Sequence, residues 1–305
     1  MNDTAAPKAC SRCSTPFSMK AEDWLAALAD SRSRLSSRPA HGVAALGLMT
    51  EVGALSATER QTIVDWAAED IAGRTPLLVT IVGSTIAEAV RLARHAQSAG
   101  AAYLAIQPLL GAKPSLAELS EFYAAIMRSV SVPVGIQNAP EYLGVGLDPE
   151  AVKILRAQHP NFLLMKGEGA VFSVKPFIDS IGADLAVFCG RGGLELPDNL
   201  RAGCAGVVPA PDCADIQVSI YEAWRAGDED RMDALYKRIL PYIVFAMQAL
   251  PVAIFYGKRM FARRARIENS CACRMKIAPE GFFDAAMIRW SSRLGAYGNG
   301  GRDAA

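Results

Sequence analysis

The chain has 305 residues, of which 51% are hydrophobic and 21% are charged, and a chain of this size can bury a full core as one domain. Its net charge is +1 at pH 7 without a long basic run, so we expect no nucleic-acid partner and no membrane partner. The seven cysteines show no disulfide-like framework, and the N-terminus lacks a charged and then apolar leader. We therefore expect a cytoplasmic protein with reduced thiols.

Two pairs of cysteines raise the question of a metal site. Cys10 and Cys13 form a C-x-x-C motif, and Cys271 and Cys273 form a C-x-C motif. Four thiolates could hold a structural zinc ion only if these distant segments met, and neither pair is flanked by further ligands. We predict no metal site, and zinc is the alternative.

Short apolar runs alternate with amphipathic helical stretches from about residue 42 to residue 210. The apolar runs lack a polar face, as expected of parallel strands that are covered on both sides. The repetition predicts a parallel sheet wrapped by helices, and we predict a (β/α)8 TIM barrel with a C-terminal helical extension. The seven strand candidates are Val43–Leu46, Leu77–Ile81, Tyr103–Gln107, Val134–Gln137, Leu163–Lys166, Ala186–Cys189 and Gly206–Val208.

A barrel needs an eighth strand, which should precede Val43. Residues 8–17 are poor strand material, and a helical stretch over 21–35 follows them. We nevertheless assign residues 1–214 to the barrel, with 1–40 as its first strand–helix unit. An open doubly wound sheet is the alternative, but no G-x-G-x-x-G follows a first strand.

From Asp215 the pattern becomes helical and predicts an extension over residues 215–294, followed by a flexible, glycine-rich tail over 295–305. Ile239–Gly257 lacks charged residues and approaches the length of a membrane span. Because it contains Pro241 and Pro251, a buried helix that breaks near Pro251 is the better interpretation.

Lys166 ends an otherwise apolar strand candidate and is followed by Gly167-Glu168-Gly169. The carboxyl ends of barrel strands open into the active site, where a partly desolvated lysine can attack a carbonyl carbon. A lysine that reaches out to solvent at the strand end is the structural alternative.

A series of motifs over residues 42–265 resembles the dihydrodipicolinate synthase / N-acetylneuraminate lyase family of Schiff-base barrels. The motifs, in order, are Gly47-Leu-Met-Thr-Glu51, Ala99-Gly-Ala-Ala102, Lys113-Pro114-Ser115, Asn138-Ala-Pro140, the strand ending at Lys166, Cys189-Gly-Arg-Gly-Gly193 and Arg201-Ala-Gly-Cys-Ala-Gly206. The resemblance implies that Lys166 condenses with the 2-oxo carbon of a small 2-oxo acid. It also implies a homo-oligomer, a tetramer or a dimer, and no cofactor.

Several residues depart from the family pattern. The threonine pair that holds the substrate carboxylate in the family falls on Leu48 and Met49, and Thr50 is the nearest hydroxyl. The family's relay tyrosine falls on Gln137, and the arginine of the synthases falls on Tyr142. Dihydrodipicolinate synthesis is therefore not expected.

A dehydratase branch of the family, acting on 2-keto-3-deoxy sugar acids such as L-2-keto-3-deoxyarabonate, shares the glutamine before Asn-Ala-Pro and the Lys-x-Glu motif. Lys166 and Glu168 lie two residues apart and would face the same way along a continuing strand. A carboxylate beside an imine can remove a proton from C3. The resemblance thus implies catalytic roles for Lys166, Glu168 and Gln137; a helix-capping Glu168 and a core amide Gln137 are the alternatives.

The remaining site residues are expected to contact the substrate: Thr50, Met49, Gly190, Gly192 and Val208. Glycines at a strand end allow close approach of a ligand oxygen to backbone amides. We predict a lyase that forms a Schiff base and dehydrates a 2-keto-3-deoxy sugar acid. Retro-aldol cleavage that releases pyruvate is the alternative reaction, and a degenerate barrel that only binds a small acid is the alternative of another class.

Overall fold

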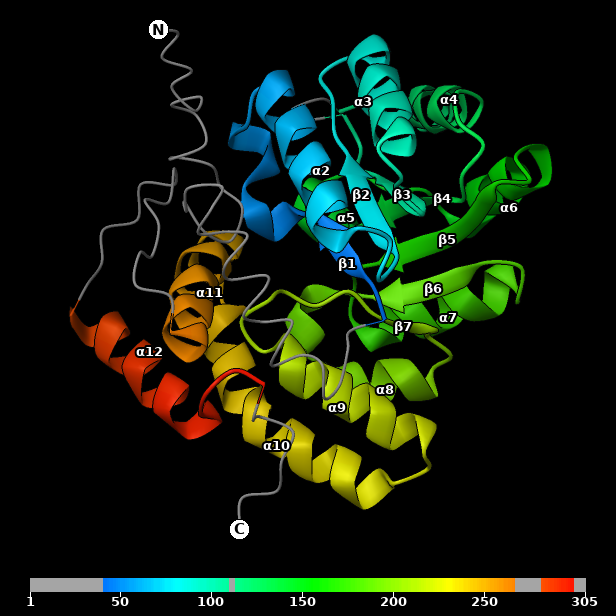
Figure 1. The fold of residues 1–305 in the computed structure, drawn as a ribbon. Coiled ribbons are helices and arrows are strands. Elements are labelled where there is room, and N and C mark those ends of the chain that lie inside the picture. Colours follow the sequence, from blue (N-terminus) through cyan, green and yellow to red (C-terminus); the bar gives the residue numbers. More distant parts are fainter. Residues whose placement is uncertain (1–40, 110–112, 267–280, 299–305) are drawn as a thin grey trace, which may run out of the picture. The chain divides into compact units, whose positions relative to one another are not determined.

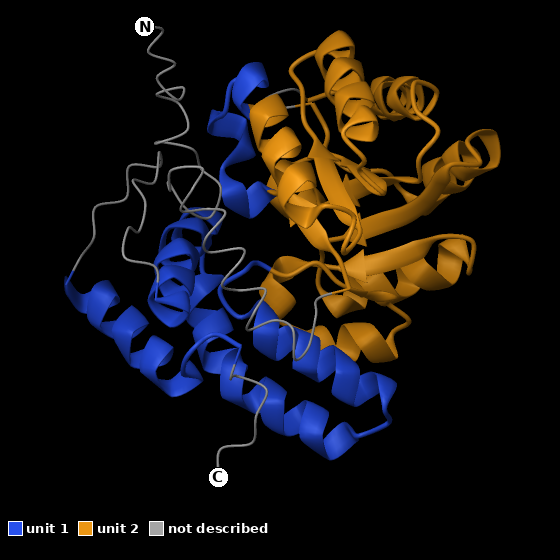
Figure 2. Cartoon of the chain, in the orientation of Figure 1, with its two compact units in different colours: residues 1–40, 48–59, 210–305 blue, residues 41–47, 60–209 orange. Residues whose placement is uncertain are grey.

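The computed structural model describes residues 41–109, 113–266 and 281–298. The chain forms two compact units, coloured separately in Figure 2. Unit 2 comprises residues 41–47 and 60–209, and unit 1 comprises residues 1–40, 48–59 and 210–305. The apolar strand candidates all lie in unit 2.

Unit 2 is built on one curved, fully parallel sheet whose seven strands follow each other in chain order (Figure 1). Each strand pairs with the next one in sequence, which confirms the predicted parallel β/α arrangement. The strands are β1 (Val43–Ala45), β2 (Leu77–Ile81), β3 (Tyr103–Ile106), β4 (Val134–Asn138), β5 (Phe162–Gly167), β6 (Ala186–Cys189) and β7 (Gly206–Val207).

Helices connect the strands and cover one face of the sheet. Neighbouring helices α3, α4, α6, α7 and α8 pack side by side in chain order (Figure 1). The helices and 3-10 turns before residue 210 are η2 (Leu48–Thr50), η3 (Val52–Ala54), α2 (Ala57–Ile71), α3 (Ile86–Ser98), α4 (Leu116–Met127), α5 (Pro140–Leu143), α6 (Pro149–Gln158), α7 (Val171–Ile181), η4 (Arg191–Gly193) and α8 (Leu196–Arg201).

Strands β2 to β6 bury most of their side chains, whereas β1 has no buried residue. Val79, Ile81, Leu104 and Ile136 have no exposed surface, as expected for runs without alternation. Local signals set where the helices begin. Ser115, for example, caps α4 in a capping box with Glu118, so the chain enters the helix directly after the β3 loop.

The eighth strand was predicted within residues 1–40, which lie outside the described residues. The seven described strands form a parallel sheet that curls into a half-barrel, and closure by an eighth strand stays a prediction.

Unit 1 contains α9 (Ala214–Arg225), α10 (Glu229–Ala246), α11 (Leu250–Ala265) and α12 (Gly281–Leu294). The apolar stretch over 239–257 breaks between α10 and α11. Pro251 lies in the first turn of α11, where a backbone N–H has no acceptor within the helix, so proline costs no helical hydrogen bond there. Among the described helices, none combines the length and the apolar character needed to cross a membrane.

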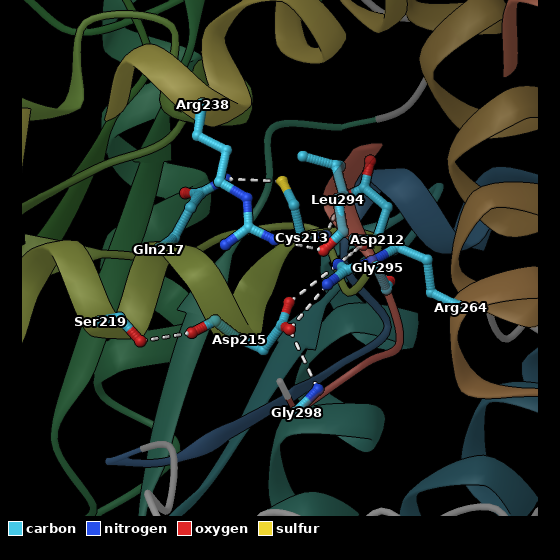
Figure 3. A network of polar contacts seen from close by, with 10 residues as sticks. All are labelled: Asp212, Cys213, Asp215, Gln217, Ser219, Arg238, Arg264, Leu294, Gly295 and Gly298. Carbon is cyan, nitrogen blue, oxygen red and sulfur yellow. Dashed lines mark hydrogen bonds and ion pairs between the residues drawn. The ribbon is translucent and has the colours of Figure 1, made fainter. Parts of the chain in front are cut away.

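A network of polar contacts links α9, α11 and the end of α12 (Figure 3). Arg264 makes two hydrogen bonds to the carboxylate of Asp215, at 2.8 and 2.7 Å, and donates to the carbonyls of Asp212 and Gly295. The amide of Gly298 also donates to Asp215, at 3.0 Å. These bonds hold residues 295–298 against the start of α9. The predicted flexible tail otherwise falls on residues 299–305, outside the described residues.

Candidate active site

Lys166 and Glu168 meet at the carboxyl end of β5. The Nζ of Lys166 lies 2.7 Å from Oε1 of Glu168, and their side chains are 17% and 7% exposed. The amide of Glu168 donates to the carbonyl of Asn138 at the end of β4, at 3.0 Å, so the strand pairing continues up to Glu168. The side chains two residues apart therefore point the same way and form a nearly buried ion pair.

Two buried glutamines occupy the neighbouring strand ends. Gln137 on β4 is the register partner of Lys166 and donates from Nε2 to Oε2 of Glu168 at 2.6 Å. Gln107, directly after β3, donates from Nε2 to Oε1 of Gln137 at 2.7 Å. Gln107 is completely buried and Gln137 is 2% exposed. Four side chains from three adjacent strands thus form one continuous polar row.

The surroundings of Glu168 favour its ionised form. Burial is the largest single influence and raises the pKa of the carboxyl group. The charge of Lys166 and hydrogen bonds from Lys166, Gln137 and the backbone of Arg191 together outweigh burial, and the pKa of Glu168 lies below its ordinary value of 4.5. Glu168 is therefore a carboxylate at neutral pH, as a general base must be.

Gly190 leaves the space that Glu168 fills. A Cβ atom at position 190 would lie 2.3 Å from Oε1 and 2.7 Å from Cγ of Glu168. Gly192, in the same turn, has a φ of 64°, in the left-handed region that favours glycine. The glycines of this turn therefore serve close packing against the carboxylate and a tight reversal of the chain.

A second polar group borders the carboxylate. Arg191 forms ion pairs with Glu195 at 2.5 Å and with Glu141 at 3.5 Å, and it shares a hydrogen bond with the phenol of Tyr142. Burial raises the pKa of Tyr142, although Arg191 lowers it, and the charge of Glu168 raises it further. Tyr142 is therefore a neutral phenol near Glu168, which can donate a hydrogen bond.

The other predicted substrate contacts are placed as follows. Val208 follows β7 and donates its amide to the carbonyl of Cys189 on β6, at 3.0 Å. Met49 and Thr50 lie in η2 and are both partly exposed; they belong to unit 1, so their contact with substrate stays a prediction.

A buried ion pair lies directly after the Thr50 position. Within unit 1, Glu51 pairs with Lys258 of α11, and both side chains are 3% exposed. Neighbouring Gly257 also lies close to Met49, because a Cβ at 257 would be 3.9 Å from the Met49 terminal methyl carbon. The loop that carries Met49 and Thr50 is thus attached to α11.

No group of three or more histidine, cysteine, aspartate or glutamate side chains suited to a metal ion occurs within the described residues. The two cysteine pairs considered as zinc ligands lie outside them.

The family model described as the dihydrodipicolinate synthetase family matches residues 13–257. The chain belongs to this family. The match begins well before β1, so it includes most of the segment in which the first strand was predicted.

Relatives within the dihydrodipicolinate synthetase family differ in their named activities. The chain is 31% identical to a probable 2-dehydro-3-deoxy-D-pentonate aldolase of Escherichia coli over 68% of this chain and 70% of the relative. It is 29% identical to a 4-hydroxy-tetrahydrodipicolinate synthase of Methanopyrus kandleri over 70% and 72% of the two chains. The two relatives thus share the family and differ in the reaction for which they are named.

The fold is shared with solved members of the dihydrodipicolinate synthetase family. The crystal structure of YagE from E. coli, a prophage protein of this family in complex with pyruvate, matches with a TM-score of 0.81 and 23% identity. The match covers 90% of this chain and 93% of that one. This likeness supports the TIM-barrel architecture for the chain.

Sequence reasoning overlooked Gln107 and Arg191 as parts of this site. Gln107 was read as the last residue of an apolar strand, and Arg191 as an ordinary member of a glycine-rich turn. The available signal for Gln107 was a polar residue at the end of a buried strand, directly before Pro108, as Gln137 ends the next strand before Asn138. Equivalent ends of adjacent parallel strands lie side by side.

Proposed function

We propose that the chain is a lyase in which Lys166 forms a Schiff base with a 2-oxo acid, and that it dehydrates a 2-keto-3-deoxy sugar acid. The observation that supports this is the 2.7 Å contact between Lys166 Nζ and Glu168 Oε1. In an imine formed by Lys166, substrate atom C3 lies two bonds from the nitrogen. A carboxylate that touches the nitrogen is thus within reach of the C3 proton.

The reaction balances with the groups present in this site. The ammonium group of Lys166 condenses with C2, and two of its protons leave with the carbonyl oxygen as water, so that a protonated imine remains. Glu168 takes a proton from C3, and the electron pair moves toward the imine nitrogen to form an enamine. The enamine expels the C4 hydroxyl group, which leaves as water with the proton from Glu168. Hydrolysis then frees Lys166 and a 3,4-unsaturated 2-oxo acid, so the net loss is one water.

Dehydration fits the residues better than retro-aldol cleavage. Cleavage requires a base for the proton of the C4 hydroxyl, a task that the resemblance assigns to the tyrosine replaced here by Gln137. A neutral amide cannot accept that proton, whereas Glu168 lies beside the imine position. The relative named as a 2-dehydro-3-deoxy-D-pentonate aldolase is the reason to keep cleavage as the second candidate.

The polar group around Arg191 supports a substrate with several hydroxyl groups. Glu141 and Glu195 accept hydrogen bonds, while Arg191 and Tyr142 donate them, and the arginine charge is already balanced by two carboxylates. A balanced set of donors and acceptors suits the hydroxyl groups of a sugar-acid chain better than a second anionic group. The imine serves as the electron sink, so the proposal needs no cofactor. Cytoplasmic location and a homo-oligomer stay predictions.

Reduction with borohydride tests the proposal. With pyruvate or a 2-keto-3-deoxy sugar acid, we expect an adduct mass on the peptide that contains Lys166. Glu168→Gln should retain this adduct, because imine formation uses the lysine, but should reduce dehydration by about 10²–10⁴-fold.

Product analysis separates the alternatives. Dehydration yields the unsaturated acid without pyruvate, whereas stoichiometric pyruvate, detected with lactate dehydrogenase, would identify an aldolase. If no adduct forms and the sugar acid remains unaltered after long incubation, the chain is a barrel that binds a small acid without turning it over.

A further inference from the structure

The two oxygens of Glu168 have different partners. Oε1 faces the nitrogen of Lys166, while Oε2 accepts a hydrogen bond from Gln137. A carboxylate with equivalent surroundings could take a proton on either oxygen. Here the two oxygens are already distinguished before a substrate arrives.

The orientation of the Gln137 amide follows from its two neighbours. An amide presents an oxygen on one side and an NH2 group on the other, and a carboxylate accepts hydrogen bonds only. The NH2 group must therefore face Glu168, which leaves the Gln137 oxygen facing Gln107. Gln107 satisfies that oxygen by donating from its own NH2 group at 2.7 Å.

The side chain of Gln107 is not open to a substrate, because none of its surface is exposed. Its side chain is completely buried and donates a hydrogen bond to Gln137. Its own Oε1 finds no hydrogen-bond partner within the part of the chain that the structure describes. An apolar side chain of similar volume would fill the same space without a buried unpaired oxygen of its own. Packing alone therefore gives no reason for an amide at this position.

We propose that Gln107 is a positioning residue: through Gln137 it keeps Oε2 of Glu168 occupied and leaves Oε1 as the atom that takes the substrate proton. Oε1 faces the nitrogen that becomes the imine, while the hydrogen bond from Gln137 holds Oε2 on the other side, so Oε1 is the oxygen beside C3. The source of that proton, C3 of the substrate, rests on the proposed function. The orienting effect of Gln107 on Glu168 does not.

Gln107→Met tests this role because methionine keeps the volume and removes the donor. Without the donor, the oxygen of Gln137 loses its partner, so Gln137 is held less firmly against Glu168 and its hydrogen bond favours the ionised form of Glu168 less. We expect the pKa of Glu168 to rise by about one unit and kcat to fall about tenfold. The titration is followed by infrared spectroscopy of protein labelled with 13C-glutamate, with Glu168→Gln subtracted to identify the band.

A second variant shows whether the effect passes through Gln137. Gln137→Met should raise the pKa of Glu168 in the same way, and adding Gln107→Met to it should cause no further change. Gln217→Met is the matched control, because it also replaces a completely buried glutamine, which lies in α9 and donates to the sulfur of Cys213. It should leave both the titration of Glu168 and the pH profile unchanged. If Gln107→Met does not fold, Gln107→Leu replaces it.

The outcomes separate the two proposals. An unchanged titration of Glu168 in Gln107→Met, or an equal further shift in the Gln137→Met background, overturns the positioning role. If the titration shifts as expected but the parent protein forms no adduct and no product, the positioning role holds and the proposed reaction fails.

Discussion

At position 168, burial and local charge act against each other on a single carboxyl group. Burial favours the neutral acid, while the Lys166 charge and three hydrogen-bonding groups favour the carboxylate, and the pKa ends below 4.5. Glu168 is therefore already ionised at neutral pH before a substrate binds, and it can act as a base without first losing a proton. Its neighbour Lys166 supplies both the favourable charge and the nitrogen of the proposed imine.

The pH dependence of kcat/KM follows from this direction. Glu168 can take a proton only when it is ionised, and its pKa lies below 4.5. Activity should therefore be lost as the pH falls through that pKa, and at higher pH the ionisation of Glu168 should not limit the rate. The rate is measured across the acid range, with circular dichroism to show that the fold persists. An acid limb near neutral pH that disappears in Glu168→Gln would contradict the assigned pKa direction.

Some site residues could be found from the sequence and others could not. Lys166 and Glu168 show a pattern, because a lysine and a carboxylate two residues apart at a strand end share a face. Gln137 was found through its resemblance to the dehydratase branch. Gln107 and Arg191 were recognised as site residues only in the structure, because the residues they contact are distant in sequence. The pattern of their own segments does not distinguish them from other residues.

The elements themselves were predictable where apolar runs alternate with amphipathic helices. Each end of the seven strands lies within one residue of the predicted end, because glycine, proline and polar residues flank the apolar runs. The break before α11 was also indicated by Pro251. The short helix α5 and the 3-10 turns were not predicted, because such segments are set by contacts of the loops and carry too few residues for a periodic pattern.

The helices of unit 1 depend on Arg264, which is fully buried and bonded to Asp215 on α9. Arg264→Met should lower the free energy of unfolding by about 3–5 kcal/mol, because it leaves a buried carboxylate without its partner. Urea unfolding measures the change. Arg263→Met is the matched control: Arg263 is exposed on the same helix, and we expect a change within about 0.5 kcal/mol. Equal effects of the two variants would show that the network does not stabilise unit 1.

At the scale of the whole molecule, the predicted eighth strand of the barrel falls within residues 1–40, outside the described residues. The family match starts at residue 13, although the first described strand begins at Val43. The prediction that residues 1–40 supply the missing strand–helix unit is compatible with this match. The sequence offers no clear strand there, because residues 8–17 contain cysteines, serines and a proline in place of an apolar run.

Removal of residues 1–40 tests this assignment. A barrel without one of its eight strands exposes two unpaired edges, so the shortened chain should lose the cooperative thermal transition of the full chain. Differential scanning calorimetry of both chains measures the transition. A shortened chain that unfolds with the same midpoint and enthalpy would show that these residues do not complete the barrel.

The lack of space at Gly190 has a consequence for the evolution of the family. A methyl group at position 190 would meet the flexible end of Glu168, so the carboxylate would be displaced while the backbone could stay in place. A side chain at position 190 is therefore expected only where position 168 is no longer glutamate. In an alignment, relatives with a glutamate two residues after the lysine should keep this glycine, and relatives with a side chain here should have lost the glutamate. The residues at positions 168 and 190 would then divide family members into those that use this glutamate to move the substrate proton and those that do not.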